Sequence, residues 1–212
     1  MKIIQKYYFK LFILILIHIM EKEDKTLIVH ENIKTMFQHR GYTDIDDTDP
    51  NYITGISLAK QTVYAFKEIF TDLNIKTINE IISTLDTLDK NPTKHCLIVY
   101  TNNCTSAVYK AVLPTSANIN INIEMFQQLD LLFLCVNHDL VPLHRKLSPP
   151  DALEFKKKYS VLGTNGKMKL KIQTMFSSDP ISKFYDFRPG DIILVERKNE
   201  LPGFRLVIAS KK

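Results

Sequence analysis

The sequence is poor in cysteine and has none of the cysteine spacings that mark redox or disulfide chemistry. Its 212 residues contain three cysteines, Cys96, Cys104 and Cys135, and an odd number cannot pair completely within one chain. None of them belongs to a Cys-x-x-Cys motif. The pattern gives no support to a disulfide-stapled fold and favours plain thiols in a reducing compartment.

The chain also lacks a hydrophobic run long enough to cross a membrane. Residues 11–20 are apolar except for His18, whereas a spanning helix needs roughly 20 apolar residues. Three lysines precede this run, as in a signal peptide, but no small-residue cleavage site follows it. Three interpretations of residues 1–20 stay open: upstream sequence without function, with translation starting at Met20; an apolar segment that packs on a partner; and membrane targeting. We do not expect membrane insertion.

No motif for a bound phosphate or metal ion is complete. Gly163 and Gly166 precede Lys167, but a phosphate loop needs four residues between its glycines and a Ser or Thr after the lysine. His138 and His144 are not joined by a cysteine or carboxylate at ligand spacing. We therefore expect no cofactor and no metal, and we assign both histidines a structural role.

One charged constellation keeps a catalytic alternative open. Asp191, Glu196 and Lys198 follow the order of metal-dependent nucleases, in which two acids hold Mg²⁺ and a lysine stabilises the attacked phosphate. Only four residues separate the two acids, so they would share one strand or a tight hairpin. The pattern is short and common by chance. A strand that ends in a charged turn is the favoured interpretation, and a stand-alone Mg-dependent nuclease is the alternative.

What the chain does have is an ordinary globular composition with an uneven charge. Apolar residues make up 45% and charged residues 24% of the sequence, and there is no internal repeat or low-complexity tract. The net charge of +5 arises entirely from residues 137–212, which carry 15 lysines and arginines against 8 acidic residues. A basic domain of this size suits an acidic partner surface or nucleic acid.

Hydrophobic periodicity predicts a mixed α/β domain in the first part of the chain. Apolar spacing indicates helices over residues 26–40 and 77–88. Strands are predicted at residues 62–70, 96–100, 119–123 and 131–136, the third from the alternation of isoleucine with polar residues. We place the end of this domain, 21–130, just before the last of these strands.

The remaining residues, 131–212, predict a small α+β domain with a mostly β core. Ser148 and Asp151 form a capping box, and Pro149 occupies the first position of a helix that should run to about Tyr159. A loop is expected at Gly163 to Gly166. Two Pro-Gly turns then lead into strands at residues 192–195 and 204–209.

The most specific signal in the sequence lies at residues 137–148, which read Asn-His-Asp-Leu-Val-Pro-Leu-His-Arg-Lys-Leu-Ser. Further blocks follow in order at Ile172-Gln173, Ser178-Asp179-Pro180 and Arg188-Pro189-Gly190-Asp191. Pattern and order together resemble the C-terminal domain of the fifth subunit of eukaryotic nuclear RNA polymerases, whose archaeal counterpart consists of that domain alone. The family pattern His-x-Leu-Val-Pro-x-His is present in full.

The resemblance extends upstream at two points. His39-Arg40-Gly41-Tyr42 is similar to the Arg-Gly-Tyr that ends the family's first helix. Val99 to Asn103, followed by Thr105 and Ser106, is similar to its strand and Asn-Asn turn, although the usual proline between Thr and Ser is missing. The resemblance thus covers both domains of the eukaryotic protein, and the divergence is similar to that of homologues carried by large cytoplasmic DNA viruses of the asfarvirus kind.

The resemblance implies a non-catalytic subunit of a DNA-directed RNA polymerase. The N-terminal domain would form part of the jaw beside downstream DNA, with weak binding to double-stranded DNA that has no sequence specificity. The C-terminal assembly domain would dock on the largest subunit, and catalysis would belong to that partner. The compartment would be the host cytoplasm and the virion for a viral protein, and otherwise the nucleus.

The resemblance also implies residue roles. A subunit interface would include His138, Leu140, Val141, Pro142, His144, Asp179, Pro180, Gly190, Asp191 and Arg205, and DNA-proximal positions would be Asn102, Asn103, Thr105 and Ser106. No small-molecule substrate is implied.

Overall fold

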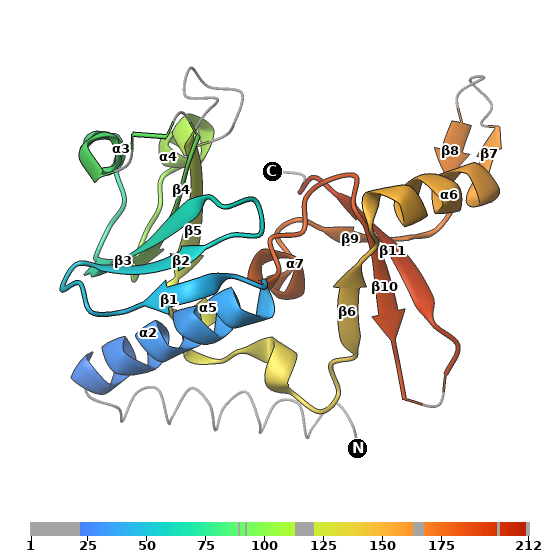
Figure 1. Cartoon of the computed structure of the whole chain (residues 1–212), viewed down its shortest axis with the longest axis horizontal. Coiled ribbons are helices and arrows are strands. Elements are labelled where there is room, and N and C mark those ends of the chain that lie inside the picture. The colour runs from blue at the N-terminus through green and yellow to red at the C-terminus, as the bar shows by residue number, and fades with distance from the viewer. Residues whose placement is uncertain are drawn as a thin grey trace. The chain divides into compact units, whose positions relative to one another are not determined.

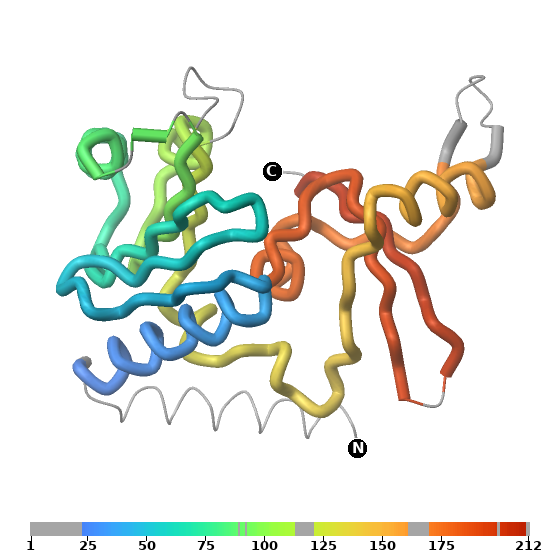
Figure 2. The backbone as a smooth tube through the Cα atoms, viewed as in Figure 1, coloured from blue at the N-terminus to red at the C-terminus, as the bar shows by residue number. Residues whose placement is uncertain are grey.

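The computed structural model describes residues 22–88, 90–91, 93–112, 121–162, 168–198 and 200–210. The chain divides into two compact units between Phe133 and Leu134, and Figure 2 traces the backbone of both. Each unit has a sheet of its own. The features predicted at residues 1–20, Ile119 and Gly163 to Lys167 lie outside the described residues. Among the helices that are described, none is both long and apolar enough to span a bilayer.

The N-terminal unit is built on a mixed five-stranded sheet in which the strands lie in sequence order. The strands are β1 (Thr43–Asp46), β2 (Tyr52–Ile56), β3 (Thr62–Phe70), β4 (Lys94–Tyr100) and β5 (Ile121–Gln127). The first three pair antiparallel, whereas β3, β4 and β5 run parallel. The carboxyl ends of β3, β4 and β5 therefore meet at one edge of the sheet.

Helices cover both faces of this sheet (Figure 1). The four described helices are α2 (Lys22–His39), α3 (Ile75–Leu88), α4 (Ser106–Val112) and α5 (Gln128–Leu132). The crossover helices α3 and α4 share one face, and α2 and α5 pack together on the other. Strand β4 is consequently buried on both sides, which explains why it reads as a continuous apolar run rather than an alternating one.

The predicted helix at residues 77–88 is confirmed, and its periodicity has the expected physical basis. Ile78, Ile81 and Leu85 are buried on one stripe of α3 and pack against Cys96 and Ile98 of β4. Each side chain of this kind contributes about 1.5–3 kcal/mol when it is removed from water. This stripe fixes α3 on the sheet.

The Arg-Gly-Tyr sequence ends α2 in a Schellman motif. The Gly41 N–H donates to the carbonyl oxygen of Gln38 at 2.9 Å, and the Tyr42 N–H donates to that of Phe37 at 2.9 Å. Gly41 has φ +74, which glycine adopts without the steric cost that a Cβ brings. The Phe37 and Tyr42 rings lie 5.0 Å apart, the hydrophobic contact that accompanies this motif.

The predicted strand at residues 131–136 is wrong. Leu131 and Leu132 are buried at the end of helix α5, and residues Cys135–Asn137 form a short 3-10 helix, η1. The Asn32 side chain donates from α2 to the Leu131 carbonyl oxygen at 2.7 Å and so holds α5 against α2. A short apolar run does not reveal by itself whether it is a buried strand or a buried helix, because both lack a polar face.

The C-terminal unit contains a four-stranded sheet in the order β6-β10-β11-β9 and a separate pair of strands. The strands are β6 (Leu143–Lys146), β7 (Ser160–Leu162), β8 (Met168–Leu170), β9 (Gln173–Phe176), β10 (Ile192–Glu196) and β11 (Gly203–Ile208). Strands β6, β10 and β11 pair antiparallel, β9 joins β11 in parallel, and β7 pairs with β8. The mixed α/β character that the sequence predicts is confirmed, with two mixed sheets.

Two helices complete this unit, α6 (Pro149–Tyr159) and α7 (Pro180–Phe184). The predicted N-cap at Ser148 is confirmed, because the Asp151 N–H donates to the Ser148 hydroxyl oxygen at 3.3 Å. The Asp151 carboxylate accepts from the Ser148 hydroxyl at 2.5 Å rather than from the Ser148 backbone N–H that a full capping box uses. Helix α6 ends at Tyr159 as predicted, and its Phe155 ring lies 4.5 Å from Phe204 of β11. The capping residues therefore place a buried aromatic on the sheet.

Candidate functional site

The His-x-Leu-Val-Pro-x-His segment forms a tight turn that leads into an edge strand. The Val141 N–H donates to the His138 carbonyl oxygen at 2.8 Å, and the Leu140 N–H donates to His138 Nδ1 at 3.1 Å. His138 thus shapes the turn. The side chain of Leu140 at its tip is 85% exposed, and that of Leu143 at the start of β6 is 57% exposed. The segment therefore presents two apolar side chains outward.

Val141 has a different environment from its neighbours. Its side chain packs against the core of its own unit, which includes Met175, Ile193, Val195 and Val207. These four residues lie on three neighbouring strands and face the same side of the sheet. Val141 therefore anchors the turn to the sheet, so that the exposed leucines are held in fixed positions.

His144 is the buried end of the segment. It lies on β6 opposite Val195 with 7% of its surface exposed, and its Nδ1–H donates to the Pro142 carbonyl oxygen at 2.7 Å. Burial lowers the pKa of His144, the hydrogen bond to Pro142 opposes that change, and nearby Arg205 lowers it further. The ring is accordingly neutral at pH 7 and serves to fix the backbone, as the sequence predicts for a structural histidine.

Asp179 and Pro180 start helix α7. The Asp179 carboxylate accepts the Ile181 N–H at 2.9 Å as an N-cap, and Pro180 takes the first helical position, where no backbone donor is needed. Ile181 and Phe187 then join the same core that receives Val141. The Ser-Asp-Pro block thus positions a helix over the sheet.

The Arg188-Pro189-Gly190-Asp191 block is a type II turn. The Asp191 N–H donates to the Arg188 carbonyl oxygen at 3.0 Å, and Gly190 has φ +98 at the position where this turn requires a positive φ. One carboxylate oxygen of Asp191 accepts the Arg188 N–H at 2.8 Å, and the other pairs with Lys146 at 2.9 Å. The turn is therefore tied to the end of β6.

The nuclease alternative is wrong in its geometry. Asp191 immediately precedes β10 and Glu196 is its last residue. At the rise of an extended strand the two lie about 16 Å apart, and five positions of separation direct their side chains to opposite faces. Asp191 pairs with Lys146, and Glu196 lies 3.6 Å from Arg145. No group of three His, Cys, Asp or Glu side chains able to hold a metal ion occurs among the described residues.

A shallow cavity of about 310 Å³ adjoins the same elements. It is lined by Lys146, Leu147, Pro149, Ala152, Leu153, Lys156, Gly190, Asp191 and Ile192. Two lysines flank an apolar floor, and the Lys156 ammonium donates to the Gly190 carbonyl oxygen at 3.2 Å. Strand β6 is the first strand of its sheet, and an edge strand offers backbone groups to a strand from another chain. Arg205, which was predicted at the interface, lies on the inner strand β11, where it is paired with Ile193 of β10.

The predicted DNA-proximal residues lie together at the carboxyl end of β4. Asn102, Asn103, Thr105 and Ser106 are all exposed. Backbone hydrogen bonds tie this turn to the loop after β3, because the Asn102 N–H donates to the Thr71 carbonyl oxygen at 2.9 Å and the Asn103 carbonyl oxygen accepts the Leu73 N–H at 3.0 Å. Ser106 begins helix α4. The turn is therefore a fixed polar ridge.

A buried ionic cluster in the N-terminal unit was not predicted from the sequence. The Arg40 guanidinium forms two hydrogen bonds of 2.7 Å with the carboxylate of Glu124, and His95 Nε2 lies 2.5 Å from one oxygen of that carboxylate. Burial would raise the pKa of Glu124, but the Arg40 charge and the His95 contact outweigh burial and hold this pKa well below its usual range. The cluster joins the end of α2 to β4 and β5.

Comparisons with known proteins find relatives of this chain among RNA polymerase subunits. A family model described as RNA polymerase Rpb5, C-terminal domain, matches residues 133–207. The chain is 26% identical over 181 residues to a proposed DNA-directed RNA polymerase subunit, 454R, of Invertebrate iridescent virus 6, covering 82% of this chain and 95% of the relative. It is 24% identical over 196 residues to the DNA-directed RNA polymerases I, II, and III subunit rpabc1 of Dictyostelium discoideum, covering 87% and 95%.

A shorter archaeal relative is more similar in sequence. The chain is 37% identical over 76 residues to the DNA-directed RNA polymerase subunit Rpo5 of Sulfurisphaera tokodaii, which covers 34% of this chain and 83% of the relative. The chain belongs to the RNA polymerase subunit 5 family.

Proposed function

We propose that the chain is a non-catalytic subunit of a multisubunit DNA-directed RNA polymerase and assembles on the largest subunit through its C-terminal unit. The observation that carries this proposal is its membership in the subunit 5 family, because its relatives bear the names of polymerase subunits in a virus, a eukaryote and an archaeon. In this role, the catalytic residues belong to a partner and this chain contributes assembly and geometry.

The exposed leucines and the edge strand support docking through the C-terminal unit. Leu140 and Leu143 project from a turn that Val141 and His144 hold in place, and β6 continues from them with exposed Arg145. An interface with an apolar centre and a polar rim is the usual anatomy of subunit contacts. Of the two lysines at the adjacent cavity, Lys146 is paired with Asp191, and Lys156 supplies a positive charge that favours an acidic group on the partner.

The polar ridge at Asn102, Asn103, Thr105 and Ser106 supports a jaw role for the N-terminal unit. Short amide and hydroxyl side chains on a fixed turn make contacts to the DNA backbone that carry no sequence information. The N-terminal unit would then touch downstream DNA weakly and without sequence specificity. Its iridescent virus relative supports a viral source, for which the compartment would be the host cytoplasm and the virion. A source of the asfarvirus kind stays a prediction, and a cellular protein would reside in the nucleus.

The direct test is purification of the tagged chain from its natural setting, followed by mass spectrometry of the proteins that accompany it. We expect the two large polymerase subunits in near-equal amount to the tagged chain. Recovery of the chain alone, from a sample in which the polymerase is abundant, would contradict the proposal.

A double substitution tests the docking surface itself. Leu140→Asp with Leu143→Asp should reduce recovery of the largest subunit at least tenfold, because two charges would have to be buried in the interface. The matched control is Leu58→Asp, since Leu58 is also 85% exposed but lies in the N-terminal unit. Equal recovery with the double variant and the control would reject these leucines as docking residues. Circular dichroism would show that the double variant remains folded.

A further inference from the structure

The positive charge of the C-terminal unit is concentrated in one stretch of the chain. Residues 155–178 contain six lysines and no acidic residue, whereas the rest of residues 137–212 contains nine basic residues against eight acidic ones. The described residues of this stretch form the end of α6 and the strands β7, β8 and β9. Nearly all of the excess charge therefore belongs to one helix end and the strands that follow it.

Strand pairing gathers three of these lysines in one place. Lys157 and Lys158 lie in the last turn of α6 and are exposed. Strand β7 follows α6 directly and pairs antiparallel with β8, with Ser160 opposite Leu170, so the exposed Lys171 returns beside the end of the helix (Figure 1). We call Lys157, Lys158 and Lys171 the lysine cluster.

The charges of the lysine cluster are not compensated within the described residues. No ion pair between described residues includes a member of the cluster, whereas Lys34 and Lys67 of the N-terminal unit both pair with an aspartate. The helix dipole favours lysines in the last turn of a helix, but it does not account for Lys171, which lies beyond α6. Neighbouring like charges repel each other, and an anionic ligand would remove that cost.

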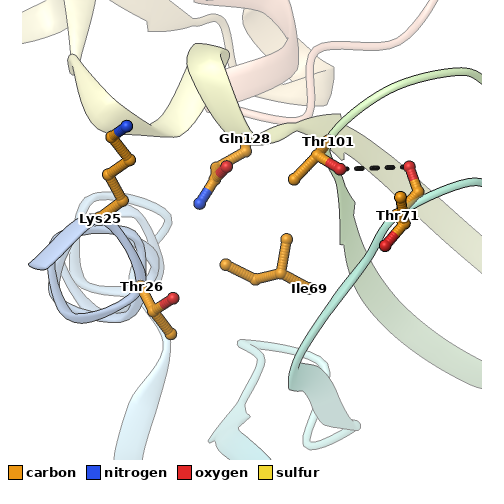
Figure 3. Close-up of a pocket in the computed structure, with 6 residues that line it drawn as sticks. All are labelled: Lys25, Thr26, Ile69, Thr71, Thr101 and Gln128. Carbon is orange, nitrogen blue, oxygen red and sulfur yellow. Dashed lines mark hydrogen bonds between the residues drawn. The ribbon is translucent and has the colours of Figure 1, made fainter. Parts of the chain in front are cut away.

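A cavity in the N-terminal unit shows no such concentration of charge. It encloses about 260 Å³ at the carboxyl ends of β3, β4 and β5, and Lys25 is the one cation among the described residues that line it. Lys25 and Thr71 lie on opposite sides of the cavity, and the Thr101 hydroxyl donates to the Thr71 carbonyl oxygen at 3.2 Å (Figure 3). A single lysine on one wall does not form an anion site, so the charge available to a polyanion lies in the C-terminal unit.

The composition of the lysine cluster favours phosphate over a protein partner. Lysine is depleted at the cores of protein interfaces, where arginine is enriched, and its ammonium is a compact, strongly hydrated charge. Single-stranded nucleic acid also needs aromatic rings on which its bases stack. The exposed Tyr159 lies beside the cluster, but its ring is packed 4.5 Å from that of Phe155 and 5.4 Å from the Lys158 ammonium. The arrangement therefore favours the phosphate backbone of a duplex.

We propose that the lysine cluster binds the phosphate backbone of duplex DNA without reading its sequence. Lysine contacts to phosphate position a protein on the duplex and carry no sequence information. The proposed function gives the C-terminal unit protein docking only, so this site is separate from the polar ridge of the N-terminal unit. The site does not depend on the proposed function, because it follows from the charge and position of these lysines.

The first measurement is the binding of fluorescent duplex DNA to the full chain across a range of salt concentrations. The variant Lys157→Gln, Lys158→Gln, Lys171→Gln should bind at least about tenfold more weakly at about 0.1 M salt, because three phosphate contacts are removed. The slope of log K against log salt should fall in magnitude by about 0.9 for each contact that is lost.

The matched control is the variant Lys60→Gln, Lys90→Gln, Lys198→Gln. It loses the same net charge, but its three exposed lysines are scattered over both units. We expect its affinity and its salt slope to stay close to those of the natural chain. Equal losses in the two variants would overturn the site, because net charge alone would then explain binding. Absence of DNA binding by the natural chain would overturn it as well.

The second measurement follows the backbone amide signals of the full chain by NMR as duplex DNA is added. We expect shifts at the lysine cluster, and much smaller shifts there with polyglutamate of matched charge. Shifts at the polar ridge alone would overturn the site and still support a jaw role. Equal shifts with polyglutamate would overturn the choice of DNA in favour of an acidic polypeptide. The triple lysine variant should still purify with the polymerase, so failure of the proposed function would be seen separately.

Discussion

At the scale of single residues, the Arg40–Glu124–His95 cluster places three ionisable side chains where little water reaches them. The Arg40 and Glu124 side chains are 2% and 12% exposed, so their charges have little access to water. A buried charge is tolerated when it is paired and becomes costly when its partner is removed. Arg40 and Glu124 therefore stabilise the fold because each neutralises the buried charge of the other beside β4.

Glu124→Gln should therefore destabilise the N-terminal unit by about 3 kcal/mol at pH 7, because Arg40 would remain buried without its counter-charge. Urea unfolding at pH 7 measures this loss. The control is Glu80→Gln, whose carboxylate is 64% exposed and 3.8 Å from Lys76, and for which we expect less than about 0.5 kcal/mol. A loss no larger than that of the control would show that the cluster is dispensable.

The pH dependence of the same variant has a definite sign. The folded-state pKa of Glu124 lies below its ordinary value of 4.5, so its contribution is fully present above that pH and is lost as the pH falls toward the folded value. The natural chain should lose stability as the pH falls below about 4.5, and Glu124→Gln should lose less over the same range.

The sequence supplied only part of this cluster. Arg40 stood out because it precedes Gly41 at a helix end, but Glu124 was only the polar residue that continues the alternation just after the strand predicted at residues 119–123. Alternation predicts that such a residue faces water, yet helices on both faces of the sheet enclose it. A pairing across 84 positions of the chain is not encoded in any local pattern.

At the scale of elements, local signals predicted the ends of helices well. The N-cap at Ser148 and the C-terminal glycine at position 41 depend on contacts within a few residues, so the local sequence is enough to predict them. The strand predicted at 131–136 failed because its structure depends on the distant Asn32. Helix α4 was missed, since Ser106 belonged to what the sequence presented as a polar turn.

Gly41→Ala should destabilise the N-terminal unit by about 1 kcal/mol. The only cost is the positive φ, because an added Cβ would have ordinary contacts of 3.8 Å or more with Leu58. Gly190→Ala is the companion variant, with φ +98 and no atom within 4 Å of its added Cβ, and a similar loss is expected in the C-terminal unit. Thermal unfolding of both variants tests the argument, and a loss above about 3 kcal/mol in either would indicate a steric clash instead.

At the scale of the whole molecule, each unit has a separate hydrophobic core. The cluster around Leu85 and Ile98 includes only residues before Phe133, and the cluster around Ile193 and Val207 includes only residues after Leu134. The archaeal relative supports the independence of the second unit, because 76 aligned residues make up 83% of its length. The family pattern in the sequence pointed to the C-terminal unit. Only the fold showed which residues of each sequence block pack into the core of that unit.

Val141→Asp should consequently unfold one unit and leave the other intact. Val141 is half-buried against the core that contains Met175 and Ile193, so a charge there would lose much of its contact with water without gaining a partner, at a cost of about 2 kcal/mol or more. Urea unfolding followed by NMR should show the C-terminal signals lost at low urea and the N-terminal signals unchanged. Simultaneous loss of both sets would contradict independent units. Unfolding of the C-terminal unit would also explain any loss of polymerase binding in Val141→Asp. Loss of polymerase binding in the folded Leu140→Asp, Leu143→Asp variant would instead show that the docking surface is damaged.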